Sequence, residues 1–319
     1  MKKVVVIGGG TGVFTVLSAL KNLPVSLIAI VTVADDGGSS GILREEFGIL
    51  PPGDIRRSLV ALSPSSSLLA KLFNYRFKNG YGLKGHSFGN LFLTALEDIT
   101  KDYNRAIEEA GKILGINGKV IPVSLTNTRL IARLENDELI IGETNIDKPK
   151  HNGDLAIKEV LLSPEAKANP LALKAIRSAD YIIIGPGDLY TSIIPNFLVK
   201  GIKETIQKSK AKKIYICNIM TKYGETTSFT AEDFLGIIEK YLGRGVINYF
   251  LVNSEKPPIK YLKLYQKEKS ELVVCKNKKQ LEKMKKPKVI FAKLVRHHPL
   301  LRHDPKKLVK VMEKLIFNN

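Results

Sequence analysis

The chain has 319 residues, 44% of them hydrophobic, which is enough for one large globular domain or two ordinary ones. Its formal net charge is +19, and no apolar run approaches the roughly 20 residues that a membrane-spanning helix needs. The short apolar stretch after Met1 ends at three glycines and does not form a secretory signal. Cys217 and Cys275 lack metal-ligand spacing, and we expect two free thiols in a cytoplasmic protein rather than one disulfide.

The positive charge is concentrated towards the carboxyl end of the sequence. From Lys256 onward there are 19 Lys or Arg residues against 5 Asp or Glu. Such a bias is also found in nucleic-acid-binding proteins, but here the lysines are scattered, without interleaved aromatic residues or a recognition motif. We interpret this segment as a solvated surface that attracts anionic ligands, and we expect neither a nucleic-acid nor a membrane partner.

The first half of the sequence alternates short buried strands, glycine-rich loops and helices. Val4–Ile7 predicts a fully buried strand, and Val13–Lys21 has the apolar spacing of a helix. A second strand is expected at Leu27–Val33. Asp54 is the natural N-cap of the next helix. Helices are expected at residues 54–62, 66–77, 88–99 and 103–114, followed by a strand at 119–125.

The second half begins with an antiparallel pattern and then returns to the parallel rhythm. Arg129–Leu134 and Glu138–Gly142 are joined by a short polar segment that is typical of a β-hairpin. Ala156–Leu162 is expected to join this hairpin in a small antiparallel excursion. Beyond it, strands are expected at residues 181–184, 214–217 and 246–252, and helices at 193–208, 231–242 and 305–316.

This alternation favours an α/β fold, a Rossmann-like doubly wound and mainly parallel sheet with a small antiparallel hairpin excursion. We expect a nucleotide-binding α/β domain over residues 1–255, with the excursion at about 126–162. Residues 256–319 are expected to form a basic tail subdomain packed on the same site. The sequence leaves open whether the protein forms a homo-oligomer.

The loop after the first strand is the first candidate ligand site. Glycines let a phosphate approach the backbone, and the following helix would present free N–H groups and its positive dipole end. The spacing is not G-x-G-x-x-G, because Val13 stands where the last glycine would fall, so a tight structural turn is the alternative. The candidate residues are Gly8, Gly9, Gly10, Thr11 and Gly12.

The loop after the second strand is the second candidate site. It lies about where a dinucleotide-binding fold places the acid that binds a ribose. Two adjacent carboxylates, Asp35 and Asp36, could instead hold Mg²⁺ beside a phosphate. A glycine-containing Asx turn is the structural alternative. The candidate residues are Asp35, Asp36, Gly37, Gly38, Ser39 and Ser40.

Arginines follow the predicted N-cap at Asp54. Arg56 and Arg57 fall in the first helical turn, where the helix dipole disfavours cations. This local conflict suggests that Asp54 and Arg56 face an anionic ligand or an interface, with solvated arginines as the alternative.

A histidine and an asparagine lie near another predicted helix start. His86 and Asn90 are four residues apart and would share a face if the helix began early enough. With Ser87, they are candidates for orienting a phosphate or a base. An ordinary capping or buried histidine is equally compatible with the sequence.

A third glycine loop follows the strand at residues 181–184. Tyr190 would offer a stacking face and Thr191 a hydroxyl donor. The candidate residues are Gly185, Gly187, Tyr190 and Thr191. No nucleophilic triad, zinc spacing or Walker lysine accompanies these loops, so neither a hydrolase nor a P-loop kinase is expected. From the residues alone, the prediction stops at a nucleotide or phosphosugar ligand.

Several motifs in order along the chain carry a family resemblance. They are VVIGGGTG at 5–12, TVADDGGSSG at 32–41, PPGDIR at 51–56, GHSFGNLFL at 85–93, GPGDLYTSIIPN at 185–196, YICNIMT at 215–221, GET at 224–226, Tyr265 within LYQKEK, and LRH at 301–303. With them the sequence resembles the YvcK-type gluconeogenesis factor family. That family is related to the CofD-type transferases, which make the 2-phospho-L-lactate linkage of a deazaflavin coenzyme.

The resemblance implies a CofD-like fold and a cytoplasmic protein needed for growth and normal cell shape on gluconeogenic carbon sources. It also implies binding of a UDP-sugar such as UDP-N-acetylglucosamine, with Tyr265 and Arg302 at that ligand. It implies no catalytic turnover and no obligatory cofactor. Asp188 departs from the pattern, since a serine is expected after Gly-Pro-Gly. An acid at this position would repel a phosphate or reach a metal.

Three hypotheses remain after this comparison of motifs. The first is a UDP-sugar sensor that couples carbon metabolism to cell-envelope synthesis through an unidentified protein partner. The second is a Mg²⁺-dependent transferase of a nucleotide-activated phospho-compound, like 2-phospho-L-lactate transferase, with Asp35 and Asp36 holding the metal. The third is a dinucleotide oxidoreductase, which both the glycine spacing and the resemblance disfavour.

Overall fold

Seven parallel strands form the central sheet of the computed structural model, which describes residues 1–64, 68–297 and 300–318. The strand order is β10-β9-β8-β7-β1-β2-β3, and every neighbouring pair is parallel. The strands are β1 (Lys2–Gly8), β2 (Val25–Val31), β3 (Lys119–Pro122), β7 (Tyr181–Ile184), β8 (Lys212–Ile216), β9 (Tyr249–Asn253) and β10 (Lys288–Ala292). The predicted doubly wound parallel sheet is confirmed.

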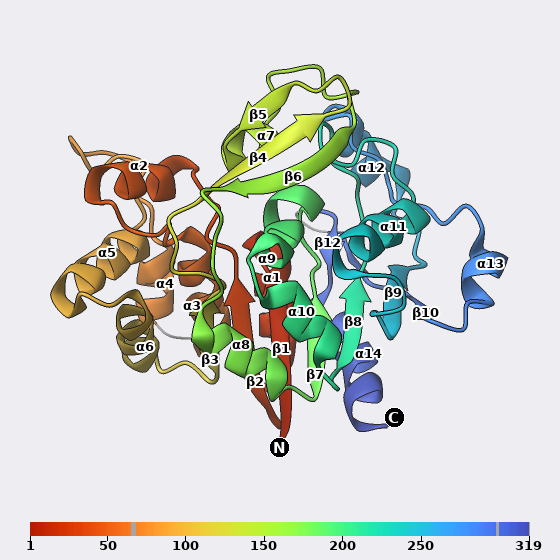
Figure 1. Cartoon of the computed structure of the whole chain (residues 1–319), viewed down its shortest axis with the longest axis horizontal. Helices are drawn as coiled ribbons and strands as arrows, with labels where there is room; N and C mark the ends of the chain where they lie inside the picture. Colours follow the sequence, from red (N-terminus) through yellow and green to blue (C-terminus); the bar gives the residue numbers. More distant parts are fainter. Residues whose placement is uncertain (65–67, 298–299, 319) are drawn as a thin grey trace.

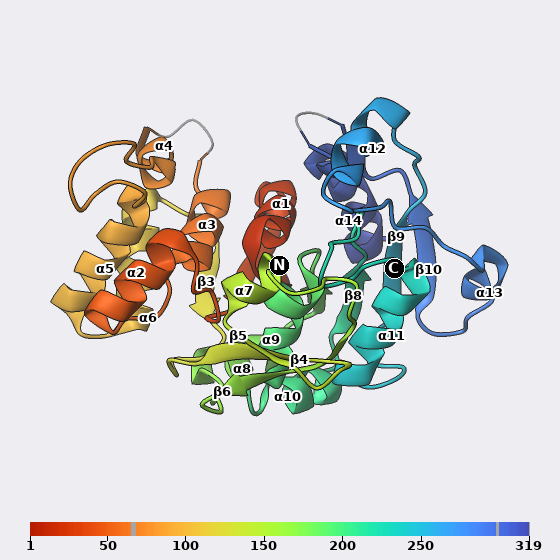
Figure 2. The same ribbon diagram turned by 90° about the horizontal axis from the view of Figure 1, so that it is seen from above.

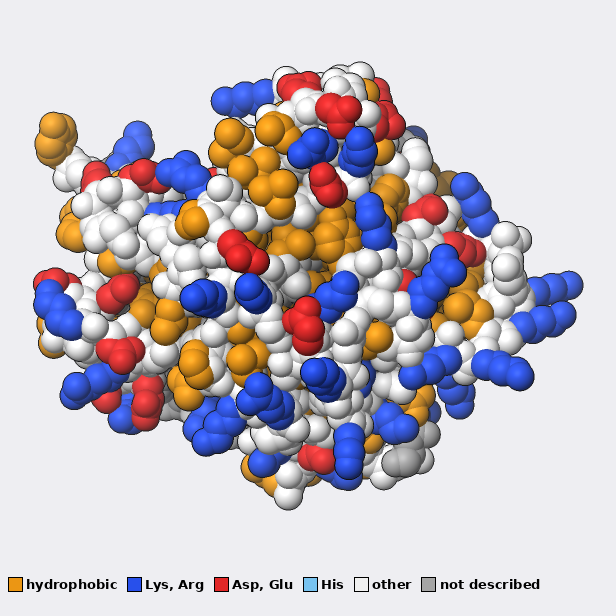
Figure 3. All heavy atoms as spheres, viewed as in Figure 1, with side chains coloured by type: hydrophobic (Ala, Val, Ile, Leu, Met, Phe, Trp, Pro, Cys, Tyr) orange, Lys and Arg blue, Asp and Glu red, His pale blue; other side chains and the backbone are white. Residues whose placement is uncertain are grey.

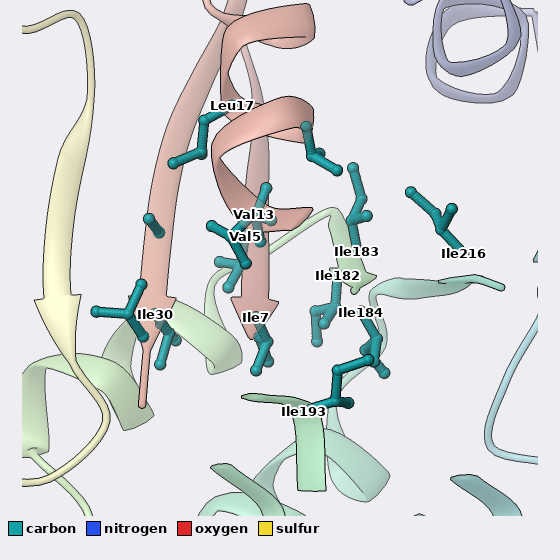
Figure 4. Close-up of a cluster of buried hydrophobic side chains, with 14 of the residues drawn as sticks. Val5, Ile7, Val13, Leu17, Ile30, Ile182, Ile183, Ile184, Ile193 and Ile216 are labelled. Carbon is teal, nitrogen blue, oxygen red and sulfur yellow. The ribbon is translucent and has the colours of Figure 1, made fainter. Parts of the chain in front are cut away.

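The middle strands are continuous apolar runs because helices cover both faces of the sheet. Val4–Ile7 in β1 and Ile182–Ile184 in β7 have no exposed surface. Figure 4 shows Ile7, Ile30 and Ile184 side by side, with Val13 of the first helix above them. Strands buried on both faces need apolar residues at successive positions rather than at alternate ones.

Helices lie on both faces of the sheet (Figures 1 and 2). One face carries α1 (Gly10–Leu20), α3 (Gly53–Leu62) and α14 (Pro305–Phe317), and the other carries α8 (Pro170–Arg177), α9 (Ile194–Leu198), α10 (Ile202–Lys208) and α11 (Ala231–Leu242). A group beside β3 contains α2 (Gly38–Phe47), α4 (Leu68–Asn74), α5 (Phe88–Thr100) and α6 (Tyr103–Leu114).

The predicted antiparallel excursion is confirmed. It consists of β4 (Arg129–Leu134), β5 (Leu139–Ile141) and β6 (Ile157–Ser163), in the order β5-β4-β6, with both pairs antiparallel. The short helix α7 (Glu143–Asp147) follows β5. This small sheet lies over the end of the central sheet to which the strand arrows point, so it can contribute residues to a site there (Figure 1).

Some predicted elements differ from the observed ones. The single helix expected at residues 193–208 is wrong. A π-helical turn, η1 (Leu189–Ile193), leads into α9, and the chain breaks before α10 because Val199 is extended and Gly201 has a φ of +97°. Asp54 is not the N-cap of α3. That place belongs to Pro52, and Asp54 lies inside the first turn.

Smaller differences concern the ends of elements. The third strand ends at Pro122 rather than 125, and the ninth begins at Tyr249 rather than 246. The predicted start of a helix at Ser66 lies outside the described residues, and that helix ends at Asn74. Such shifts are expected because a proline, which lacks an N–H donor, or a turn can end an element where the apolar pattern of the sequence continues.

Residues 256–319 join the main body at several points, including the isolated bridge between Met220 and Leu272. They contribute β10, which pairs with β9, and α14, which packs against α1. They also contain α12 (Ile259–Gln266), α13 (Lys278–Glu282) and the short antiparallel pair β11 (Val295–Arg296) and β12 (Arg302–His303). The boundary at residue 255 stays a prediction. Figure 3 shows Lys and Arg side chains gathered around α13, as a solvated basic surface requires.

The cysteines and the helix lengths bear on two further expectations. Cys217 is buried and Cys275 half-buried, and neither forms a disulfide. Within the described residues, every helix is too short or too polar to span a bilayer.

Candidate functional site

A cleft of about 620 Å³ lies where the loops after β1, β2, β7 and β8 meet. The sheet order reverses between β1 and β7, and such a switch point is where open α/β sheets bind ligands. Most of the predicted site residues line this cleft. They are Gly9, Gly10, Thr11, Gly12, Asp35, Gly37, Gly38, Ser39, Ser40, Asp54, Arg56, Asn90, Gly187, Thr191, Tyr265 and Arg302. Gly8, Asp36, His86, Ser87, Gly185 and Tyr190 lie outside its lining.

Three helices begin at the cleft. The first residues of α1, α2 and α3 are Gly10, Gly38 and Gly53, and all three line it. None of these three described helices has a side-chain hydrogen bond at its N-cap. The Gly10 N–H donates to the buried Asp54 carboxyl, and the other N–H groups and positive dipole ends at these helix starts converge on one space, an arrangement that binds phosphate or carboxylate groups.

The first glycine loop packs directly against the third. A Cβ atom on Gly12 would lie 1.9 Å from the Pro186 carbonyl oxygen. This is far inside van der Waals contact, and the obstacle is backbone, which cannot rotate away. A glycine is therefore required where the loops after β1 and β7 form the floor of the cleft.

Two carboxyl groups in the cleft hold protons more strongly than usual. Burial, together with the charge of Asp35, raises the pKa of Asp54 to about 6, although Arg57 opposes this from 3.7 Å. Burial and the same Asp35 charge raise the pKa of Glu143, at the start of α7, to about 9. At neutral pH Glu143 is protonated, so it can donate a hydrogen bond and adds no repulsion against an anion.

The raised pKa of Glu143 predicts a pH-dependent stability difference. A carboxyl group whose folded-state pKa is raised contributes stability below its unfolded pKa and loses it as pH rises through the folded value. As pH rises from 5 to 9, the stability of Glu143→Gln is therefore expected to rise relative to that of the parent by up to about 1.4 kcal/mol per pH unit. Denaturant unfolding at pH 5, 7 and 9 measures this, with the exposed Glu138→Gln as control. A difference between parent and Glu143→Gln that is constant with pH would contradict it.

The adjacent acids Asp35 and Asp36 have different surroundings. Asp35 lines the cleft and accepts the Gly37 N–H at 3.0 Å. Asp36 accepts the backbone N–H groups of Glu143 and Thr144 at 3.1 and 2.8 Å, which anchors the start of α7. The two acids expected to hold Mg²⁺ together therefore differ, because the backbone of α7 engages the Asp36 carboxylate and Asp36 is absent from the described lining of the cleft.

His86, Ser87 and Asn90 lie behind Ser39. The Asn90 amide donates to Ser39 Oγ at 3.1 Å, and His86 Nδ1 lies 3.1 Å from the same oxygen. The helix α5 begins at Phe88 with Ser87 as its N-cap, so His86 and Asn90 do not share a helix face. They meet through Ser39, whose position at the start of α2 they support.

Arg56 and Arg57 differ in burial and in the groups that they contact. Arg56 is buried and donates to Asn90 Oδ1 at 3.0 Å and to Asn74 Oδ1 at 2.7 Å, so it ties α3 to neighbouring helices. Burial lowers its pKa to about 10, which leaves it a cation at neutral pH. Arg57 pairs with Asp54, but 45% of its side chain is exposed at the cleft, so it can also meet an anion there.

The third glycine loop reaches the cleft only in part. Gly187 and Thr191 line it, whereas Tyr190 is 2% exposed, with its hydroxyl 3.5 Å from the Ile157 carbonyl oxygen. The expectation that Tyr190 stacks on a ligand is therefore wrong in this geometry, because its ring lies in the core.

Sequence reasoning missed Lys222 at the cleft. Its ammonium pairs with the carboxylates of Asp147, Asp188 at 2.8 Å and Glu225 at 3.0 Å. Burial lowers the pKa of Lys222, but these three carboxylates together raise it well above its ordinary value. The unexpected acid at Asp188 is thus neutralised by a neighbour. The motif ending at Thr221 stops one residue short of this lysine, which was the available signal.

Tyr265 and Arg302 reach the same cleft from the tail. Tyr265 lies on α12 and its hydroxyl donates to the Leu301 carbonyl oxygen at 3.3 Å. Arg302 lies on β12 and lines the cleft. The cleft therefore combines loops from the first 60 residues with segments from beyond residue 260.

Fold and cleft together define a doubly wound, Rossmann-like α/β protein with a site suited to anions. Comparison with known proteins agrees with this class. The model of the family described as 2-phospho-L-lactate transferase CofD matches residues 4–295. The chain belongs to the CofD family.

Within this family the chain is similar to proteins called gluconeogenesis factor. It is 43% identical to the one from Bacillus subtilis, over 98% of both chains, and 50% identical to the one from Halalkalibacterium halodurans, over 86% of this chain and 84% of the other. A crystal structure of a UPF0052 family member from Bacillus halodurans matches with a TM-score of 0.91 and 46% identity, covering 98% of each chain. The resemblance drawn from the motifs is confirmed.

Proposed function

We propose that this protein is a nucleotide-sugar-binding regulatory protein whose ligand is a UDP-sugar of the UDP-N-acetylglucosamine type. The observation that carries the proposal is the convergence of three helix starts in one cleft that Tyr265 and Arg302 also line. A diphosphate fits the helix starts, a planar guanidinium fits phosphate oxygens, and a tyrosine ring fits a flat base.

The size and charge of the cleft support the same ligand class. Its volume of about 620 Å³ lies within the range of small-molecule sites. Arg57, Arg76 and Arg302 line it together with polar side chains that can meet sugar hydroxyls. Protonated Glu143 would act as a donor among them.

We further propose that the protein acts in the cytoplasm and supports growth and cell shape on gluconeogenic carbon sources. The support is the name gluconeogenesis factor borne by its relatives. In this proposal ligand occupancy reports the supply of nucleotide sugar to a protein partner in cell-envelope regulation.

The ligand class is tested by calorimetric titration of the purified protein. UDP-N-acetylglucosamine or UDP-glucose is expected to bind at micromolar affinity, which corresponds to about 8 kcal/mol. NAD is expected to bind much more weakly, since the first loop lacks the dinucleotide glycine spacing. UMP and inorganic diphosphate serve as controls that separate the contributions of base and phosphate. NAD bound more tightly than every UDP-sugar would overturn the proposal.

A Mg²⁺-dependent transferase is the second candidate, favoured by the match to the CofD family model. In that case Asp35→Asn is expected to abolish product formation, and Mg²⁺ to strengthen nucleotide binding by screening carboxylates from phosphates. Mass spectrometry of reaction mixtures and titrations in Mg²⁺ and in EDTA test it. Equal affinities without any product would leave the regulatory protein as the surviving candidate.

A further inference from the structure

The cluster around Lys222 joins three separate parts of the chain at one wall of the cleft. Asp147 ends α7, Asp188 precedes η1 in the third glycine loop, and Lys222 and Glu225 lie in the loop after β8. Oxygen atoms of the three carboxylates lie within 4.8 Å of one another. Oxygen sets of this kind bind Mg²⁺, Mn²⁺ or Ca²⁺.

A cation already stands among these carboxylates. The Lys222 ammonium contacts all three, and its side chain is only 26% exposed. The lysine backbone is also held, because its N–H donates to Thr226 Oγ1 at 3.0 Å and its carbonyl accepts the Thr226 N–H at 2.8 Å. The ammonium is thus positioned by a tight turn rather than by a flexible surface segment.

Glu225 is the most firmly placed of the three acids. Its side chain is 0% exposed and accepts the Tyr190 N–H and the Thr191 hydroxyl, both at 3.2 Å. Burial raises its pKa to about 7, against the opposing charge of Lys222. Without a cation beside them, three carboxylates at this spacing would repel one another in a partly buried site.

We propose that the Lys222 ammonium takes the place of a divalent cation at this wall of the cleft, so that ligand binding needs no metal ion there. Asp188 then has a second use. Its side chain is 41% exposed beside the cleft, and with its charge neutralised it can accept hydrogen bonds from ligand hydroxyl groups. The role of Asp188 in binding ligand hydroxyl groups rests on the proposed function, whereas the role of Lys222 as the cation does not.

The test removes the ammonium and offers a metal ion alone, with no nucleotide. Lys222→Met is expected to melt at a lower temperature than the parent in EDTA and to recover in millimolar Mn²⁺. Its affinity for Mn²⁺ is expected to exceed that of the parent by at least about tenfold, because three carboxylates that have lost the Lys222 ammonium can bind the metal ion together. Lys222→Met combined with Asp188→Asn should lose most of this gain. Calorimetry and melting curves measure both quantities.

Lys112→Met is the matched control. Lys112 also pairs with two carboxylates, Glu108 and Glu109, but on an exposed helix surface where water screens their charges. It should gain no Mn²⁺ affinity. If Lys222→Met fails to fold, Lys222→Gln, which can still donate hydrogen bonds to the cluster, supplies the same measurement.

Three results would overturn the proposal. Equal Mn²⁺ affinity of the parent and the Lys222 variants would show that the ammonium does not occupy a cation site. A Mn²⁺ gain that survives Asp188→Asn would place the new site elsewhere. In the parent, UDP-sugar affinity is expected to be the same in Mg²⁺ and in EDTA, and a Mg²⁺ requirement that Asp188→Asn abolishes would refute metal-free binding. Failure of UDP-sugars to bind at all would instead affect the proposed function and leave the Mn²⁺ result intact.

Discussion

Gly12→Ala is expected to abolish UDP-sugar binding and to lower the free energy of unfolding by about 3 kcal/mol. The added methyl group would meet the Pro186 carbonyl oxygen at 1.9 Å, with the carbonyl carbon at 2.4 Å. Relief requires the loops after β1 and β7 to separate, which would move the start of α1 away from the other two helix starts. Denaturant unfolding gives the stability loss, and calorimetry gives the loss of binding.

Gly236→Ala is the control for this variant. Gly236 lies inside α11, and a Cβ atom added there meets nothing within 4 Å. Alanine at this position should raise the free energy of unfolding by about 0.5–1 kcal/mol and leave ligand binding unchanged. A Gly12→Ala protein as stable as the parent would mean that the two loops can part without cost, contrary to the packing described.

Arg302→Ala is expected to weaken UDP-sugar binding by roughly 1.5–3 kcal/mol, the range for hydrogen bonds to charged groups. Its thermal stability without ligand should barely change, because Arg302 lies at an open cleft and supports little of the core. Tyr265→Ala should behave similarly but with some loss of packing, since its hydroxyl bonds to the Leu301 carbonyl oxygen. Titrations and melting curves on both variants measure these effects.

Arg296 supplies a control from the same small sheet. It is the partner of Arg302 across the β11–β12 pair, it is exposed, and it is absent from the described lining of the cleft. Arg296→Ala should therefore keep the affinity of the parent. If Arg302→Ala and Tyr265→Ala both bind as tightly as the parent, the tail takes no part in the site and is a basic surface only.

The parallel sheet could be predicted because most of its strands are short apolar runs, two of which, β1 and β7, lead directly into glycine loops. Val4–Ile7 and Tyr181–Ile184 are buried on both faces, and such strands need no alternation to be recognised. Helix ends were harder to predict. The break between α9 and α10 depends on the φ of Gly201, which apolar periodicity does not reveal. The place of β10 in the main sheet was also missed, because its half-buried strand lies in a lysine-rich segment.

The parts of the cleft that consist of glycine loops and helix starts could be predicted from the sequence. Glycines and hydroxyl residues at helix starts, such as Gly10 and Ser39, are visible in the sequence because the geometry of an anion site demands them. Contacts between distant segments were not visible. Lys222 meets Asp147 and Asp188 only after three loops come together, and Tyr190 enters the core because the chain turns as a π-helix there.

The central position of β1 also affects how the protein is made. Its partner β2 follows almost at once, but its other neighbour, β7, begins only at Tyr181. At ribosomal speeds of about 5–20 residues per second, roughly 10–35 s pass between the synthesis of β1 and the synthesis of that neighbour. During this time the nascent chain displays an unpaired hydrophobic edge, which is a template for aggregation. Correct folding in the cell therefore depends on keeping that edge covered, a task suited to a chaperone at the ribosome exit.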